Sequence, residues 1–212
     1  MTARPSRRRP LLAGPASLAL LAALLTAGCL SRPSLVRERY GLLVPPPGTP
    51  PPEATKVLAL PSVEVPAAFD RIGFVYRTGE TKYETDPYTQ WLSAPREQLA
   101  EALRANLRTT GLFRDVGRVS RGADLVARVT VTEVYGDFRK PDAPAARVAL
   151  EVTIARRAEP GRPAEAPLTR GYAMSLPIPA RTPEAVAEGI GLAVAQAASE
   201  IAIDVRRAGL AP

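Results

Sequence analysis

The chain of 212 residues contains no histidine and a single cysteine, Cys29. Histidine is the commonest general base at neutral pH and the commonest neutral metal ligand. One cysteine cannot form an intrachain disulfide or a zinc site of several thiolates. Catalysis of the Ser-His-Asp or Cys-His type is therefore excluded, and we expect neither a metal site nor a cofactor.

The sequence also lacks the glycine-rich loops that bind nucleotides. No P-loop pattern occurs, and the one Gly-x-Gly, at 189–191, lies inside a predicted helix with no strand before it. Basic residues alternate with acidic ones along the chain, so no focused basic face favours nucleic acid as a partner. Carboxylate pairs can hydrolyse glycosidic bonds, but the sequence singles out none. We expect a protein that is not an enzyme, with a lipid-anchored hydrolase that uses carboxylates alone as a remote alternative.

The first 28 residues have the pattern of a lipoprotein signal peptide. Four arginines precede an apolar run from Ala16 to Ala27, and small residues lead to the cysteine in Ala27-Gly28-Cys29. The apolar run is shorter than the roughly 20 residues that a transmembrane helix needs. Thr26 stands where bacterial lipoboxes usually have leucine, with Leu25 one place earlier. We predict cleavage between Gly28 and Cys29 and lipidation of Cys29, in preference to a buried free thiol.

Removal of the leader changes both the charge and the reach of the protein. Residues 1–28 carry four basic and no acidic side chains, so the net charge falls from +7 to +3. Residues 29–37 form the lipidated tether, which spans about 30 Å when fully extended. Leu30 is not the aspartate that resembles an inner-membrane retention signal, so we expect the periplasmic face of the outer membrane. The domain then comprises residues 38–212.

Alternating apolar residues predict several strands. Two runs, 125–131 and 148–154, alternate with period two, as half-buried antiparallel strands do, and the first slips in phase at Glu133-Val134, which predicts a β-bulge. Further strands are expected at 40–44, at 56–65 with a break at Pro61, at 72–78, at 81–85 and at 168–176.

Two helices are predicted. In the first, at 95–110, Leu99, Leu103 and Leu107 form an apolar stripe, and the charged residues 96, 97, 101, 104 and 108 are expected on a solvated face. The second begins at Thr182-Pro183-Glu184, a capping hydroxyl followed by a first-turn proline and an acid, and continues to about residue 207. Its many small residues allow a close neighbour, which is either its own sheet or, in addition, another subunit. Together the elements predict an α+β fold: an antiparallel sheet of about six strands packed against two helices, the C-terminal one long.

The segment from 63 to 107 carries a recognisable order of motifs. Val63-Glu64-Val65-Pro66 and Phe69-Asp70-Arg71 precede a strand with Arg77, and Tyr88-Thr89-Gln90-Trp91 leads into the first helix. With Tyr40-Gly41-Leu42 after the lipobox, this pattern resembles the ABC-type transport auxiliary lipoproteins, which include the paraquat-inducible protein C-like lipoproteins. Phe69 replaces the leucine that is common there.

The resemblance implies a subunit of an envelope lipid-transport system. Such lipoproteins pair with a periplasm-spanning protein that bears mammalian-cell-entry (MCE) domains and with an inner-membrane transporter component. The implied role is to dock and seal the outer-membrane end of a lipid conduit as a homo-oligomer. The alternative is a scaffold lipoprotein of another envelope-assembly machine, for outer-membrane proteins or lipopolysaccharide.

Four residues are candidates for the partner interface: Tyr88, Trp91, Arg71 and Arg77. Tryptophan, tyrosine and arginine are enriched at interface hot spots. For Trp91 a core position that pins the start of the first helix to the sheet is an equally concrete role, and the two arginines can also be ordinary charges at strand ends.

Overall fold

A computed structural model describes residues 37–46, 48–158 and 166–212. The signal peptide, Cys29 and most of the tether lie outside the described residues. Residues 37–212 form a compact unit with a continuous hydrophobic core of its own. The elements are β1 Glu38–Tyr40, β2 Val57–Ala59, β3 Val63–Glu64, β4 Gly73–Arg77, β5 Tyr83–Trp91, α2 Pro95–Thr109, β6 Asp115–Gly117, β7 Leu125–Asp137, β8 Ala145–Arg156, β9 Leu168–Pro177 and α3 Pro183–Arg207.

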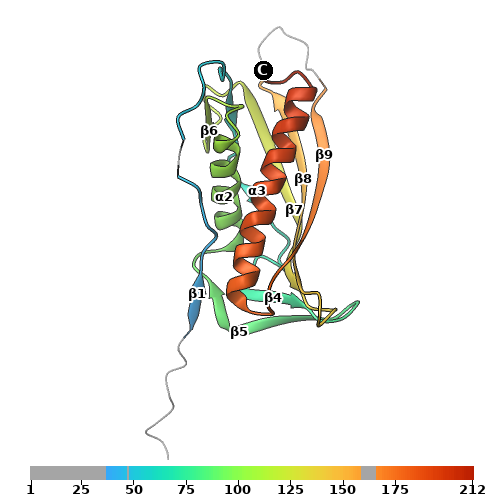
Figure 1. Ribbon diagram of the computed structural model, residues 1–212. Helices are drawn as coiled ribbons and strands as arrows, with labels where there is room; N and C mark the ends of the chain where they lie inside the picture. The colour runs from blue at the N-terminus through green and yellow to red at the C-terminus, as the bar shows by residue number, and fades with distance from the viewer. Residues whose placement is uncertain (1–36, 47, 159–165) are drawn as a thin grey trace, which may run out of the picture. The chain divides into compact units, whose positions relative to one another are not determined.

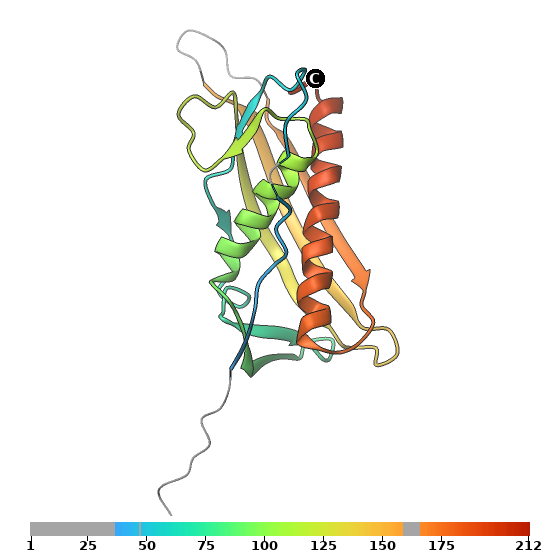
Figure 2. The same cartoon turned by 60° about the vertical axis from the view of Figure 1, so that its left-hand side comes forward.

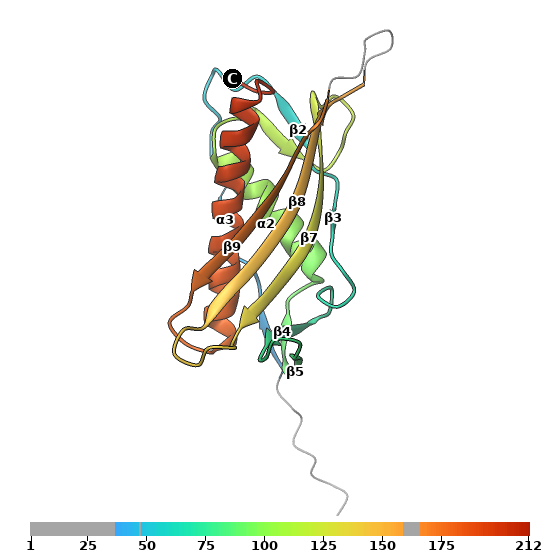
Figure 3. The same ribbon diagram turned by 90° about the vertical axis from the view of Figure 1, so that its right-hand side faces the viewer.

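The sheet is organised around β7. Along one edge β7 pairs antiparallel with β8, which pairs with β9. Along its other edge three short strands follow one another, all parallel to it: β2 at Leu125, β3 at Val129 and β4 at Gly136. The sheet continues outward from β2 to β6, and from β4 through β5 to β1. Figure 3 shows β7, β8 and β9 side by side, with β4 and β5 crossing one end.

Both helices cover the same face of the long strands (Figures 1 and 2). The side chains that alternate along β7 and β8 are buried under them, because one face of each strand points toward the helices. Thr182 caps α3 by accepting a hydrogen bond from the backbone N–H of Ala185 at 3.3 Å, as predicted. α3 would be long and apolar enough to cross a membrane by length and composition alone, but 56% of its most apolar window is buried within the fold. It therefore serves as a core helix.

Gly189 sets how closely α3 approaches the sheet. A Cβ atom at this position would lie 2.7 Å from the Cβ of Ala146 on β8 and 2.6 Å from Cγ2 of Ile178. Two residues further along the same helix, a Cβ at Gly191 would meet only the backbone nitrogen of Leu43, at 3.9 Å. Gly189, the first glycine of the Gly-x-Gly, therefore has a packing role. The predicted position of this motif inside a helix is confirmed.

The predicted sheet was wrong in two respects. It is mixed rather than antiparallel, and it has nine strands rather than six. Strands of two or three residues carry too little alternation to be recognised, and β6 was missed for this reason. The first strand ends at Tyr40, not Val44, because the N–H of Leu42 donates to the side chain of Gln98 (2.9 Å) instead of to a strand. The break at Pro61 is confirmed, and the predicted bulge is present between Val131 and Glu133, just before the predicted Glu133-Val134.

Arg104 was also placed on the wrong face. The prediction assigned it to solvent, but its side chain is only 2% exposed. Its Nη1 donates to the carbonyl of Leu60 at 3.0 Å, in the break between β2 and β3, and its Nη2 pairs with Glu101 at 2.8 Å. The segment that joins β2 to β3 therefore packs over this face of α2, and its Leu60 carbonyl takes its hydrogen bond from Arg104.

Candidate functional site

Several connections of the fold meet at one end of the molecule, where β1 begins. They are the β4–β5 hairpin at 78–82, the β7–β8 connection at 138–144 and the β9–α3 connection at 178–182 (Figures 1 and 3). We call this the β1 end. Because the tether is joined to the domain at Arg37, this is the end at which the chain leaves toward Cys29.

An aromatic cluster holds the β4–β5 hairpin against β7. Phe69 stacks on Tyr135 with ring centroids 5.8 Å apart, and Tyr83 meets both rings edge-on. After the bulge, Tyr135 lies on the sheet face opposite the helices, because one extra residue inverts the alternation. Arg77 donates to the hydroxyl of Tyr135 at 3.3 Å and lies 5.6 Å from the centre of the Tyr83 ring. This cluster forms a second, smaller core outside the helix-covered face.

Arg139 links the β7–β8 connection to the β4–β5 hairpin. Its guanidinium binds Asp137 through two hydrogen bonds, of 3.0 and 2.7 Å, and Glu80 at 3.1 Å. The hydrogen bonds from Arg139 hold the pKa of Asp137 below its usual value, against the opposing effect of burial. Asp137 therefore remains ionised and engaged by Arg139 at neutral pH.

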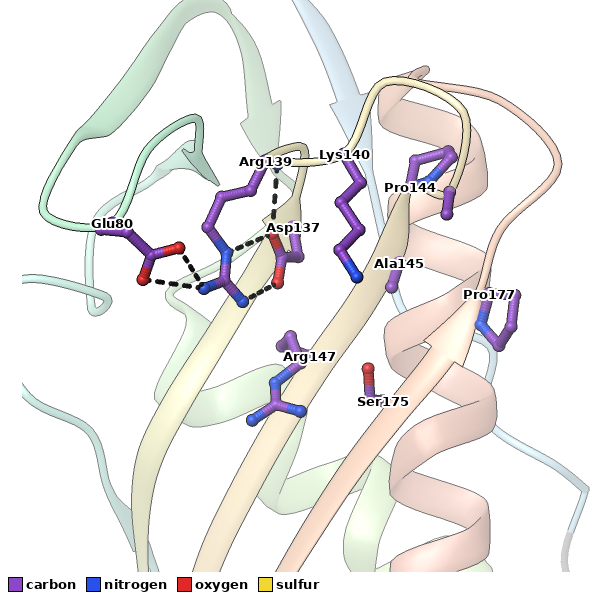
Figure 4. Close-up of a pocket in the computed structure, with 10 residues that line it drawn as sticks. Glu80, Asp137, Arg139, Lys140, Pro144, Ala145, Arg147, Ser175 and Pro177 are labelled. Atoms are coloured by element: carbon purple, nitrogen blue, oxygen red, sulfur yellow. Dashed lines mark hydrogen bonds and ion pairs between the residues drawn. The ribbon is translucent and has the colours of Figure 1, made fainter.

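A cavity of about 550 Å³ lies beside this cluster, between the β7–β8 connection and β9. Figure 4 shows the ammonium of Lys140 and the Ser175 hydroxyl pointing into the same space, with Arg147 beside it and its guanidinium directed away from Lys140. Ser175 and Arg147 are direct neighbours in the β8–β9 register. Volumes of roughly 300–1,000 Å³ are typical of small-molecule sites. We call this space the hairpin pocket; its walls are Glu80, Asp137, Arg139, Lys140, Ala143, Pro144, Ala145, Arg147, Ser175 and Pro177.

The hairpin pocket is supplied with cationic donors. Arg147 pairs with Glu133 through Nη2 at 3.1 Å, while its Nε is buried and has no hydrogen-bond partner. It is the only such buried side-chain atom in the described part of the chain. No ion pair or hydrogen bond engages the ammonium of Lys140 within the described residues. Across the same described ranges, no group of three or more Asp, Glu, Cys or His side chains could hold a metal ion.

The predicted interface residues are separated by the fold. Trp91 is 6% exposed and stacks on Phe74 with centroids 4.0 Å apart, so its side chain belongs to the core beneath the start of α2. Arg77 is half-buried in the aromatic cluster. Tyr88 is 53% exposed and Arg71 is exposed, so these two remain available to a partner. Cys29 and Gly28 lie outside the described residues.

Sequence reasoning missed the hairpin pocket. The alternation in β8 does place Arg147 on the outward face, opposite Val148 and Leu150. Its proximity to Ser175 and Lys140 depends on the β8–β9 register and on the path of the proline-containing connection, which no local pattern specifies.

Comparison with known proteins agrees with this architecture. The family model described as the ABC-type transport auxiliary lipoprotein component matches residues 40–202. A crystal structure of an uncharacterised protein superposes with a TM-score of 0.66 at 20% identity, covering 80% of this chain and 99% of that one. A protein from Xanthomonas campestris superposes with a TM-score of 0.63 at 17% identity, covering 81% and 99%. At these identities the two structures establish a shared fold and nothing more.

No protein with a curated description matches the chain. The family match spans α2, the whole sheet except the start of β1, and most of α3, within which it ends. It covers well over half of the sequence and includes the 63–107 segment on which the resemblance was based. The chain therefore belongs to the ABC-type transport auxiliary lipoprotein component family.

Proposed function

We propose that this protein is a non-enzymatic lipoprotein of the outer membrane, and that it docks a periplasm-spanning MCE-domain protein of an envelope lipid-transport system. The observation that carries the proposal is the family match over residues 40–202, and the predicted signal peptide and lipidation of Cys29 are consistent with it. The inner-membrane transporter component of the same system would be the second partner.

The short tether supports a role at the membrane surface. With Cys29 acylated, residues 29–37 let the domain move no more than about 30 Å from the lipid. The first described residues, at Arg37 and Glu38, lie at the β1 end. A domain held this close suits the docking of a partner that arrives from the periplasm.

The chemistry of the described residues supports a non-catalytic role. The two carboxylates that line the hairpin pocket, Asp137 and Glu80, are both bound by Arg139. Acid–base pairs in hydrolases need one carboxyl group with a raised pKa, and Asp137 has a lowered one. This arrangement counts against the hydrolase that uses carboxylates alone.

We further propose that the protein is a homo-oligomer. The sequence suggested subunit contacts along faces of α3 that its own sheet does not use. On α3, Leu192 is 64% and Ile203 is 46% exposed, and Leu43, 76% exposed, borders the same groove as Leu192. Exposed apolar side chains that gather in this way are typical of protein contacts. We assign a second copy of the chain to the surface at Leu43 and Leu192.

The docking proposal is tested by crosslinking in the native host followed by affinity purification of the full-length protein. An MCE-domain protein should be recovered, and a Tyr88→Ala/Arg71→Ala double variant should recover less of it at equal abundance. Cys29→Ser should lack acyl groups by mass spectrometry, and the MCE-domain protein should then be lost from the outer-membrane fraction. Recovery of an outer-membrane-protein or lipopolysaccharide assembly component instead would replace the proposal with the scaffold role.

A further inference from the structure

The hairpin pocket has more donors than acceptors for them. Arg139 is fully engaged by Asp137 and Glu80, so it stiffens the wall without offering a free charge. Lys140 and Arg147 supply two further cations. Of the carboxylates around them, Asp137 and Glu80 are taken by Arg139, and Glu133 takes a single arm of Arg147. Ser175 adds a hydroxyl, which can donate or accept. The pocket is therefore built to receive a group that carries negative oxygens.

The orphaned Nε of Arg147 points to the same conclusion. A buried donor without an acceptor is costly, and native structures contain few of them. The side chain of Arg147 is 30% exposed, so its guanidinium borders the pocket although Nε itself is covered. Among the described residues only Nη2 of this guanidinium has an acceptor, so a change of side-chain rotamer away from Glu133 would present Nη1 and Nε to an incoming oxygen. Planar guanidinium forks bind carboxylate and phosphate through two parallel hydrogen bonds.

We propose that the hairpin pocket binds a phosphate group, with Arg147 and Lys140 as the charged donors and Ser175 as a third, neutral contact. A phosphate offers the three or more acceptor oxygens that donors from three directions require, whereas a carboxylate offers two. The phosphate belongs either to a lipid headgroup or to a small soluble phosphate. The pocket is lined by the β7–β8 connection, which lies at the β1 end. The proposal does not depend on the MCE partner.

The test uses the unlipidated domain, residues 30–212, because residues 37–212 form a compact unit with its own core. Binding is measured by co-sedimentation with phosphatidylcholine vesicles that contain phosphatidic acid. Vesicles with the same surface charge supplied by oleate carboxylates serve as the comparison, and inorganic phosphate is titrated as a competitor. We expect binding to the phosphatidic acid vesicles to exceed binding to the oleate vesicles.

Variants then assign the binding to the pocket. Lys140→Gln and Arg147→Gln should each weaken binding about tenfold, because hydrogen bonds to charged groups are the stronger class. Lys82→Gln removes the same charge from an exposed residue of the neighbouring hairpin that pairs with Glu84, and should change affinity less than about twofold. Glu133→Gln releases Arg147 and should strengthen binding, whereas Glu84→Gln, which makes the same charge change, should not. Thermal midpoints show whether each variant is folded.

The outcomes separate the two sources of phosphate. Binding to phosphatidic acid vesicles that millimolar inorganic phosphate does not displace identifies a lipid headgroup. Displacement by inorganic phosphate, with direct binding of the ion in calorimetry, identifies a small phosphate. Equal losses for Lys140→Gln and Lys82→Gln, equal binding to both kinds of vesicle, or no binding in either assay would overturn the proposal. The crosslinking experiment on the MCE partner is independent of all three results.

Discussion

Alanine substitutions at Gly189 and Gly191 measure how much the stability of the domain depends on the close approach of α3 to the sheet, because only Gly189 lies at that contact. Replacing glycine by alanine in a helix interior stabilises it by about 1 kcal/mol through helix propensity. This gain is common to both positions and cancels when the two variants are compared. What remains is the cost of the added methyl group at Gly189, where it would lie 2.7 Å from the Cβ of Ala146.

Carbon atoms in contact normally lie about 3.5–4.0 Å apart, so α3 must move away from β8 by about 1 Å to accept that methyl group. Overpacking of this kind costs about 1–3 kcal/mol. We therefore expect Gly191→Ala to be slightly more stable than the wild type and Gly189→Ala to be about 2 kcal/mol less stable than Gly191→Ala. For a domain of this size the two thermal midpoints should differ by about 4–8 °C.

Urea unfolding of residues 30–212, followed by circular dichroism, gives the free energies. Ala146→Gly provides the internal check, because it removes the β8 atom that Gly189→Ala meets. The cost of Gly189→Ala should be smaller in the Ala146→Gly background than in the wild type, by a coupling that a double-mutant cycle measures. If Gly189→Ala is as stable as Gly191→Ala, close helix–sheet approach is not what the glycine provides and the reasoning fails.

Three further predictions concern the stability and assembly of the domain. Arg104→Ala should lower the free energy of unfolding by about 2–3 kcal/mol, because it leaves the Leu60 carbonyl without its donor. Lys82→Ala, which removes one partner of an ion pair exposed on both sides, should cost less than about 1 kcal/mol, and similar losses in denaturant unfolding would contradict this. The hydrogen bond from the Val57 N–H and, to a smaller extent, the charge of Lys56 hold the pKa of Asp124 below its usual 3.8. Ionised Asp124 therefore stabilises the fold above pH 3.8, and this contribution is lost as the pH falls below that value. Asp124→Asn keeps an acceptor but cannot titrate, so between about pH 5 and pH 3 the wild type should lose more stability than this variant; parallel losses would rule the effect out. Leu192→Glu should lower the oligomeric state in light scattering with little change in thermal midpoint, and an unchanged mass would place the subunit contact elsewhere.

The sequence was informative where a pattern is repeated within one element. Val148 to Ile154 alternate over seven residues, and Leu99, Leu103 and Leu107 recur every four, so β8 and α2 could be placed to within a few residues. The parallel pairings could not be predicted in this way. β2 and β7 meet across more than sixty residues of sequence, and nothing in three residues of β2 indicates its partner.

Individual side chains also differ in whether their position follows from a pattern within one element or from a contact with a distant segment. Trp91 is buried because β5 continues past the predicted end at residue 85 and places it on the face that carries Phe74, in the core position that was one of the two roles predicted from the sequence. Arg104 is buried because a distant broken strand packs over it, which the pattern of α2 does not contain. The hairpin pocket belongs to the second kind, since its donors come from β8, β9 and the connection before β8.

The position of β7 has a consequence for the order in which the protein folds. Strands β2, β3 and β4, all within residues 57–77, take their hydrogen-bonding partner from residues 125–137. The first half of the chain therefore has no complete template until the second half has emerged. Pairings between distant segments form slowly, because a large loop must close first. For the exported lipoprotein proposed above, this delay would keep the sheet incomplete while the chain passes through a secretion channel.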